Sequence, residues 1–125
     1  MSLYQICYTD SLLAGPVKEA IALALTQLHC DLTGSPPDNV KVFFRQMDLW
    51  SFWSGGKRAK KYIRAEAQVM KSCDSEHKFA VLSGMYKVII AAMDEKGVRA
   101  EIQTQITEVD MSETVMTNGA LEVAV

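Results

Sequence analysis

The sequence has few cysteines and lacks the spacing that cross-linked or metal-stabilised domains use. Its three cysteines, Cys7, Cys30 and Cys73, are an odd number and contain no C-x-x-C pair, which argues against a disulfide framework and against a zinc site. The glycines near Lys57 do not form a phosphate-binding loop, because the required spacing is missing. We therefore expect no metal and no cofactor, and Cys7 is most simply a small buried side chain.

Long hydrophobic runs and a strong excess of charge are also missing. The longest apolar stretches, near 20–25 and 88–93, are too short to span a bilayer, and the first residues do not resemble a signal peptide. The formal net charge is −2, so the chain has no general attraction to nucleic acid or to anionic lipid. These features predict a cytoplasmic protein, and 125 residues with 49% hydrophobic content suit one domain.

One basic run follows a group of aromatic residues in the middle of the chain. Lysines and an arginine crowd positions 57–61, just after the aromatic residues of 50–53. Such a combination can bind single-stranded nucleic acid. A solvated turn next to packed aromatic residues is the simpler interpretation in a chain of negative net charge, so we do not expect nucleic-acid binding.

What the chain does contain is a strand, helix and strand pattern. Residues 3–8 predict a strand from their β-branched and aromatic content. Gly15-Pro16 predict the start of a helix whose apolar residues recur at helical spacing up to His29. After a turn-rich stretch, residues 40–45 alternate as a second strand, and residues 50–56 read as a turn.

The same pattern then occurs a second time. Residues 61–69 alternate as a strand with one polar face. Asp74 or Ser75 can cap a helix with apolar positions from Phe79 onward, and Gly97 can end it. Residues 98–107 alternate as a fourth strand.

Two βαβ units in tandem, over 2–48 and 60–109, predict an α+β fold with a four-stranded sheet and both helices on one face. The other face would carry a polar row that suits water or a neighbouring subunit. The apolar tail, 110–125, is predicted to be an oligomerisation segment that pairs with a neighbour's sheet edge. Oligomerisation is therefore expected.

Several local features of this pattern resemble the tautomerase superfamily, whose fold is also called MIF-like. They are the strand that begins at residue 2, His29 near the end of the first helix, Thr33-Gly34 after it and Gly55-Gly56 before the second unit. The branch that looks nearest is that of cis-3-chloroacrylic acid dehalogenase and its fungal relatives. The resemblance covers nearly the whole chain and implies a homotrimer with a catalytic amino-terminal proline in a pocket near a subunit boundary.

The resemblance implies two catalytic candidates. The family proline falls on Ser2, because an initiator methionine is normally removed before a small residue. A free amine there could act as a neutral base or an imine-forming nucleophile; alternatively, Ser2 only begins a strand, or Met1 remains and blocks the site. The family histidine matches His29, where it helps to bind a carboxylate or carbonyl. His29 could also be an acid or base, or only a partner for carbonyls at the end of the helix.

Other family residues are replaced in this chain. The two family arginines fall near Met70 and Cys73, or near Lys71 and Asp74 if the register shifts by one. The family tyrosine falls among Gln103 to Ile106, and the water-activating glutamate falls near Thr117. These replacements argue against hydration or dehalogenation in the manner of the family.

Several remaining side chains complete the predicted substrate site. Lys71 or Arg64 could supply a single cation, although a surface lysine and a sheet-face ion pair with Glu66 are the simpler readings. Trp50 and nearby methionines could line a larger apolar pocket. The amides of Gln103 and Gln105 could polarise a substrate.

We therefore predict a divergent tautomerase-like protein with a rebuilt, more apolar pocket. It would catalyse a proton-transfer isomerisation, dehydration or cyclisation of a small organic metabolite, such as one of secondary metabolism. The alternative from another class is a non-catalytic homotrimer that binds a small molecule or serves as a scaffold. The sequence leaves open which of the two applies.

Overall fold

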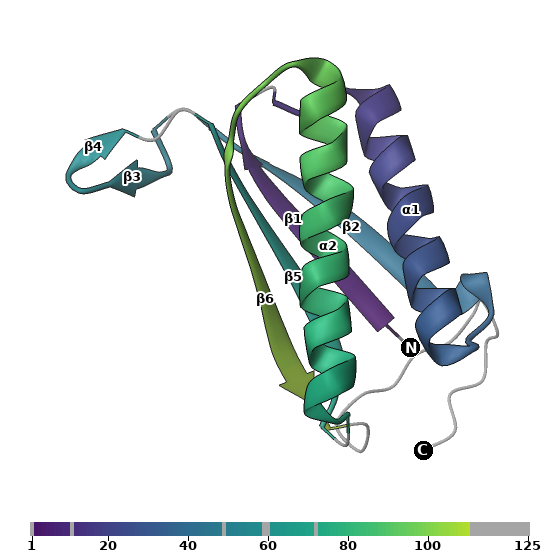
Figure 1. Cartoon of the computed structure of the whole chain (residues 1–125). Coiled ribbons are helices and arrows are strands. Elements are labelled where there is room, and N and C mark those ends of the chain that lie inside the picture. The colour runs from purple at the N-terminus through teal and green to yellow at the C-terminus, as the bar shows by residue number, and fades with distance from the viewer. Residues whose placement is uncertain (1, 11, 49, 59–60, 72, 111–125) are drawn as a thin grey trace, which may run out of the picture.

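A computed structural model describes residues 2–10, 12–48, 50–58, 61–71 and 73–110 (Figure 1). Within these ranges the chain forms a main sheet, a short hairpin, two α-helices and one turn of 3-10 helix. In chain order the elements are β1 (Ser2–Thr9), α1 (Gly15–Thr33), η1 (Pro37–Asn39), β2 (Val40–Met47), β3 (Trp53–Ser54), β4 (Lys57–Arg58), β5 (Tyr62–Met70), α2 (Ser75–Lys96) and β6 (Glu101–Val109).

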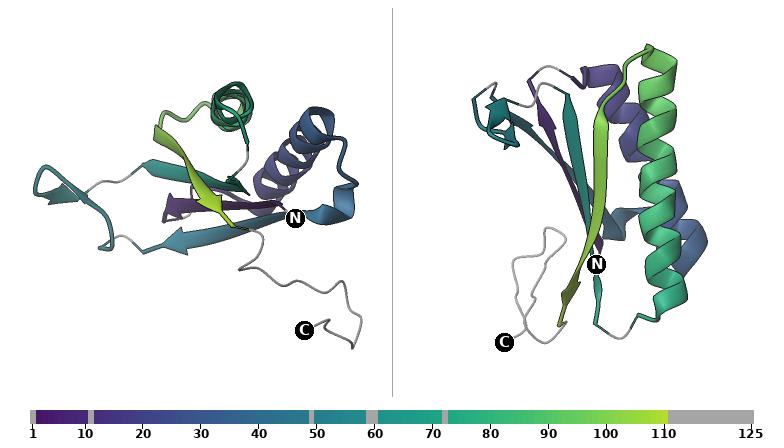
Figure 2. Two further views of the ribbon diagram at one scale, coloured as in Figure 1. Left: turned by 90° about the horizontal axis from the view of Figure 1, so that it is seen from below. Right: turned by 60° about the vertical axis from the view of Figure 1, so that its left-hand side comes forward.

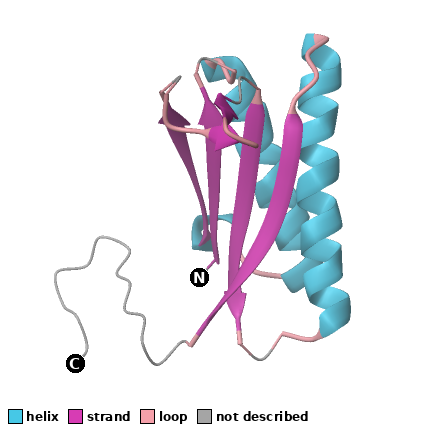
Figure 3. Cartoon of the chain, turned by 90° about the vertical axis from the view of Figure 1, so that its left-hand side faces the viewer, coloured by secondary structure: helices cyan, strands magenta, loops and turns pink. Residues whose placement is uncertain are grey.

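The main sheet joins two βαβ units through its central strands. Its order is β2-β1-β5-β6, with β1 parallel to β2, β5 parallel to β6, and β1 antiparallel to β5. Both helices cover the same face, and the strands lie in front of them when the sheet is viewed from its other side (Figures 2 and 3). The predicted α+β arrangement is confirmed.

Alternation along the strands separates the two faces of the sheet. On β1, Tyr4, Ile6 and Tyr8 face the helices and are buried, because successive side chains of a strand point to opposite sides. The helices close this core with residues at helical spacing: Ile21, Leu25 and His29 from α1, and Val81, Met85, Ile89 and Met93 from α2.

The structure corrects three predicted element boundaries. Helix α1 continues past His29 to Thr33 and ends where Gly34, at a φ of 73°, donates its N–H to the Cys30 carbonyl. Strand β6 begins at Glu101 instead of residue 98, since Val98 still bonds back to the carbonyl of Met93. The predicted turn region contains the hairpin β3–β4, whose Gly55 and Gly56 have φ values of 58° and 77°, as a two-residue hairpin loop requires.

The residues predicted for the apolar face of α2 include one that is exposed. Phe79 is 70% exposed, because the helix turns it away from the stripe that contains Val81 and Met85. The predicted N-cap and C-cap are both present: Asp74 accepts a hydrogen bond from the His77 N–H, and Gly97 is left-handed. Neither helix in the described ranges has the length and hydropathy of a membrane-spanning helix.

Gly84 sets the distance between the two helices. A Cβ at this position would lie 2.6 Å from Leu28 Cδ2 and 2.9 Å from Leu28 Cδ1. We expect Gly84→Ala to lower the free energy of unfolding, because a clash of about 1–3 kcal/mol outweighs a helix-propensity gain of about 1 kcal/mol. Urea unfolding at one fixed protein concentration measures the effect.

The same substitution in a Leu28→Ala background is the control. With the Leu28 side chain removed, Gly84→Ala should raise the free energy of unfolding by about 1 kcal/mol relative to Leu28→Ala alone. An equal loss in both backgrounds would contradict the close contact between the helices.

Candidate functional site

The topology brings several predicted site residues to one end of the sheet. The amino end of β1 lies beside the carboxyl end of β5, where Leu3 pairs with Gln68. β6 ends alongside, since Met70 pairs with Val109 and the Lys71 N–H donates to the Val109 carbonyl at 3.1 Å. We call this end of the sheet, with the carboxyl end of α1 above it and the first turn of α2 beside it, the β1-start region.

His29 is the central side chain of the β1-start region. It continues the buried stripe of α1 one turn after Leu25, and its side chain is 4% exposed. Its Nδ1 lies 2.8 Å from the hydroxyl of Tyr4 on β1, and the two rings meet edge to face with centroids 5.7 Å apart. A helix position that would otherwise hold an aliphatic residue thus holds an imidazole with a defined partner.

Burial fixes the protonation states of this pair. Desolvation lowers the pKa of His29, and the positive charges of His77 and of the amino terminus lower it further, so the ring is neutral at pH 7. Burial raises the pKa of Tyr4 to about 12, so its hydroxyl keeps its proton. Nδ1 of the neutral ring either accepts from the Tyr4 hydroxyl or donates to it, depending on which ring nitrogen carries the proton. In either tautomer the pair holds a neutral imidazole against the Tyr4 hydroxyl.

His77 is a neighbour that the sequence analysis missed. It lies in the first turn of α2, where its backbone N–H donates to Asp74 Oδ1 at 2.7 Å, and its charge acts on His29. No motif marks it. Its position in the sequence could have indicated this place, because the first turn of the second helix follows the loop on which the family arginines were placed.

Other predicted residues share this end of the sheet. Ser2 begins β1, and Met70 is the last residue of β5. Lys71 is exposed, while Cys73 is half-buried against the core and donates its N–H to the Met70 carbonyl at 3.0 Å. Thr117 and the tail after residue 110 lie outside the described residues.

Gln103 and Gln105 lie on the uncovered face, opposite His29. The Tyr62 hydroxyl donates to Gln103 Oε1 at 2.6 Å, Gln103 Nε2 donates to Gln105 Oε1 at 3.3 Å, and Gln105 Nε2 donates to Glu66 Oε2 at 2.6 Å. These amides form a hydrogen-bonded row along the sheet. The structure does not bring them together with His29, because they occupy the other set of alternate strand positions.

Arg64 and Trp50 also lie away from His29. Arg64 is on the uncovered face, beside Cys7 in the sheet register. Trp50 is 66% exposed next to the β3–β4 hairpin, where the Arg58 guanidinium stacks over its ring at 4.5 Å. Within the described ranges, no group of three or more His, Cys, Asp or Glu side chains is arranged to hold a metal ion.

The chain matches a family model over most of its length. Residues 1–121 match the model named Tautomerase_3, described as "Putative oxalocrotonate tautomerase enzyme". No curated protein matches the sequence.

Solved structures with low sequence identity share the fold. Native Ps01740 is 20% identical, with a TM-score of 0.81 over 90% of this chain and 97% of its own. N1, a member of the cis-3-chloroacrylic acid dehalogenase family, is 19% identical, with a TM-score of 0.78 over 95% and 82%. The Q0 fused 4-OT wild-type symmetric trimer is 13% identical, with a TM-score of 0.78 over 94% of each chain.

The buried imidazole should make stability depend on pH. The pKa of His29 in the folded chain lies below its ordinary value of 6.5, so the unfolded chain binds a proton that the folded chain excludes. We expect the free energy of unfolding to fall as the pH drops below about 6.5, until the pH passes the folded pKa. Urea unfolding between pH 7 and pH 5 measures this slope.

Two variants assign the slope to a residue. His29→Gln should flatten it over this pH range. His77→Gln should keep most of it, because desolvation, and not the charge of His77, is the larger cause of the lowered pKa. A slope that survives His29→Gln would mean that another group titrates.

Proposed function

Because the chain belongs to the Tautomerase_3 family within the tautomerase superfamily, we propose that it moves a proton on a small organic substrate held at the β1-start region. The reaction class is isomerisation, dehydration or cyclisation through an enol. The observation that carries this proposal is His29, a buried, neutral imidazole held by Tyr4 at the end of the sheet where β1 begins.

His29 would act on the substrate oxygen. A neutral N–H donor in a desolvated site stabilises the negative charge that develops on a carbonyl oxygen when a neighbouring carbon loses its proton. His29 Nε2 would supply that hydrogen bond, and Tyr4 would keep the ring in the required tautomer. The substrate oxygen, not the imidazole, would carry the charge of the enolate.

The amino terminus would be the base. An exposed α-amine titrates near about 7.7–8.0, so a freed amine on Ser2 could take the proton from carbon and return it to another atom of the substrate. Ser2 lies two residues before Tyr4, which contacts His29, and this supports their proximity. An intact mass of the purified protein shows whether Met1 has been removed.

The surroundings favour a more apolar substrate than a small dicarboxylate. The chain places Met70 and Cys73 at this end of the sheet, with Lys71 as an exposed cation. One point charge can hold one carboxylate or carbonyl but cannot grip two oxygens in the bidentate manner of an arginine. We therefore propose a metabolite with at most one acidic group near the reacting carbon.

The same replacements also support a non-catalytic protein that binds a small molecule or serves as a scaffold. The two classes differ in one observable. An enzyme exchanges a proton on the substrate carbon, whereas a binding protein only shifts the equilibrium of free ligand.

We also propose that the chain is a homotrimer, since the fused 4-OT relative with the same fold is a symmetric trimer. The polar row and the exposed Phe43 on the uncovered face support a surface that meets another subunit. Light scattering should give a mass about three times the 13.9 kDa of one chain. A monomer at micromolar concentration would contradict the trimer.

The mechanism predicts the effect of two substitutions on keto–enol exchange, measured with phenylenolpyruvate as a probe. His29→Gln should lower kcat/KM by about 100-fold or more, since the loss of one positioned donor to a developing oxyanion costs about 10²–10³ in rate. Tyr4→Phe keeps the ring packing but removes the partner of Nδ1, so we expect a smaller loss of about 10-fold.

Thr26→Val is the matched control on α1. Thr26 lies on the same helix, and its hydroxyl bonds only the local Ala22 carbonyl among the interactions described, so exchange should stay within a few-fold of the native chain. Native activity in His29→Gln would contradict the role of His29. No exchange by the native trimer with a free residue-2 amine would favour the non-catalytic protein.

A further inference from the structure

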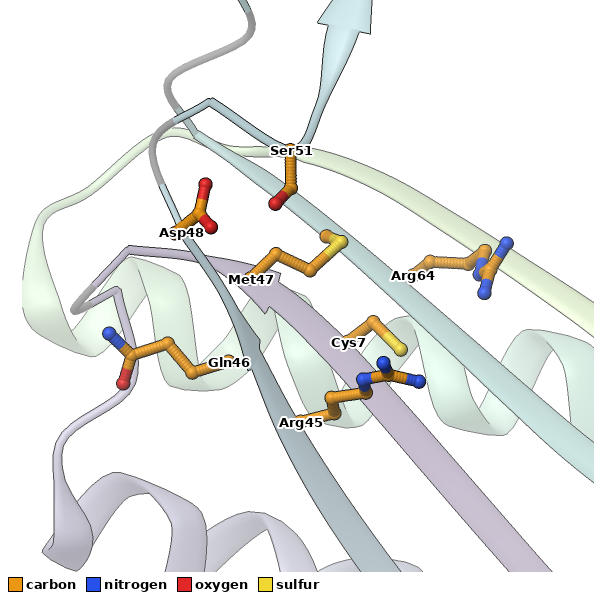
Figure 4. Close-up of a pocket in the computed structure, with 7 residues that line it drawn as sticks. All are labelled: Cys7, Arg45, Gln46, Met47, Asp48, Ser51 and Arg64. Atoms are coloured by element: carbon orange, nitrogen blue, oxygen red, sulfur yellow. The ribbon is translucent and has the colours of Figure 1, made fainter.

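A second hollow lies on the uncovered face of the sheet, near the carboxyl ends of β1 and β2. Its volume is about 370 Å³, within the range of small-molecule sites. Figure 4 shows the side chains around it. Those that matter here are Cys7, Arg45, Met47, Asp48, Ser51 and Arg64.

Sheet register explains the hollow. Cys7 pairs with Arg45 on β2 and with Arg64 on β5, so the three residues form one row across the sheet. Strands lie about 4.8 Å apart, which puts the two arginine Cα atoms about 10 Å from each other. A small side chain between two long ones leaves a depression, and Figure 4 shows the Arg45 guanidinium extending over the strand toward Cys7.

Among the described residues, neither guanidinium group forms an ion pair with an acidic side chain. The ion pair found there joins Lys78 and Glu108, far from this row. Glu66, the next acidic residue on the uncovered face of β5, accepts a hydrogen bond from Gln105. Two cationic side chains whose Cα atoms are about 10 Å apart make a local positive field on one face of a chain whose net charge is −2.

Asp48 is the acidic group at the rim of the hollow, and its carboxylate accepts hydrogen bonds within the turn that follows β2. Its Oδ1 accepts the Trp50 N–H at 2.8 Å, and this bond, together with those from Ser51, lowers the pKa of the Asp48 carboxyl. The carboxylate therefore holds the turn that forms the wall of the hollow. That turn also places the Ser51 hydroxyl at the rim, beside the thioether of Met47.

We propose that this hollow binds a small oxyanion, a carboxylate or a phosphate, through Arg45 and Arg64. A guanidinium presents a planar fork of N–H groups that fits two oxygens of such a group. The Arg45 fork lies beside Cys7, and the Arg64 side chain, which extends away from Cys7 in Figure 4, would turn toward it so that both hold one anion, with Ser51 as an additional donor. Met47 gives an apolar wall, so an anion that carries a short hydrocarbon part fits better than a bare ion.

This oxyanion site is separate from the β1-start region. Arg45 and Arg64 stand on the face opposite His29, and their row is at the other end of β1. The proposal therefore does not rest on the proton-transfer function, and either can fail without the other.

Amide NMR of the intact oligomer tests the site, with inorganic phosphate and butyrate as probes at constant ionic strength. We expect saturable shifts of the backbone amides of Cys7, Arg45 and Arg64 with at least one probe. Saturable shifts with phosphate but not with butyrate would identify a phosphate site. Tighter binding of butyrate than of phosphate would identify a site for a carboxylate with an apolar part. No saturable shift with either would overturn the proposal, including the case in which oligomer formation covers the hollow.

Charge-removing variants identify the ligands. Arg45→Gln and Arg64→Gln should each weaken binding by about tenfold or more, as expected for the loss of a charged hydrogen-bonding group. Arg58→Gln is the matched control, because it removes the same charge from the hairpin outside the hollow and should change binding less than twofold. Equal weakening in all three would mean general attraction by positive charge, and would overturn the site.

The conservative pair Arg45→Lys and Arg64→Lys separates the fork from the charge. Lysine keeps the charge but not the planar pair of donors, so these variants should bind more weakly than the native chain and more tightly than the glutamine variants. Far-UV circular dichroism on each variant checks the fold. Full binding by both lysine variants would contradict two-oxygen recognition.

Discussion

The antiparallel pairing of β1 with β5 is the constraint on which the rest of the structure depends. Each βαβ unit is parallel inside itself, and only this central pair joins the two units into one sheet. It lays the start of β1 beside the end of β5, and β6 follows β5 in parallel. The start of β1, the end of α1 and the loop before α2 therefore meet at one end, although they are far apart in the sequence.

The contact between His29 and Tyr4 shows how closely the core and the candidate site are joined. A neutral imidazole buried against a tyrosine hydroxyl satisfies both polar groups, and no buried side-chain nitrogen or oxygen in the described residues lacks a partner. Removing one member would take a hydrogen bond from the other in a desolvated place, at a cost of about 1 kcal/mol. Substitutions here therefore alter stability and chemistry together, which is why packing-preserving changes such as Tyr4→Phe are informative.

The sequence was sufficient for those features that depend on local pattern. Period-two strands and helical apolar spacing predict the two units and the shared helix face, while the grouping of His29 with the loop around Met70 was implied by the family resemblance. Features that depend on the register between strands could not be predicted from the sequence alone. Gln103 and Gln105 were proposed as substrate ligands because the family tyrosine falls near them, although alternation along β6 already places them on the uncovered polar face, opposite His29. The row formed by Arg45, Cys7 and Arg64 needs the order β2-β1-β5, which no single strand contains.

β1 contributes to both proposed sites, and its geometry explains why they can differ in chemistry. Tyr4 faces the helices and Cys7 faces the opposite side, and at about 3.3 Å per residue the two Cα atoms lie about 10 Å apart. A dry, neutral site can therefore exist on one face while two arginines create a wet, positive site on the other, because the sheet separates the two surroundings. Substitutions at this distance without shared contacts usually act additively. The side chains of one face could thus change without altering the other, provided that the backbone pairing of β1 with β2 and β5 is kept.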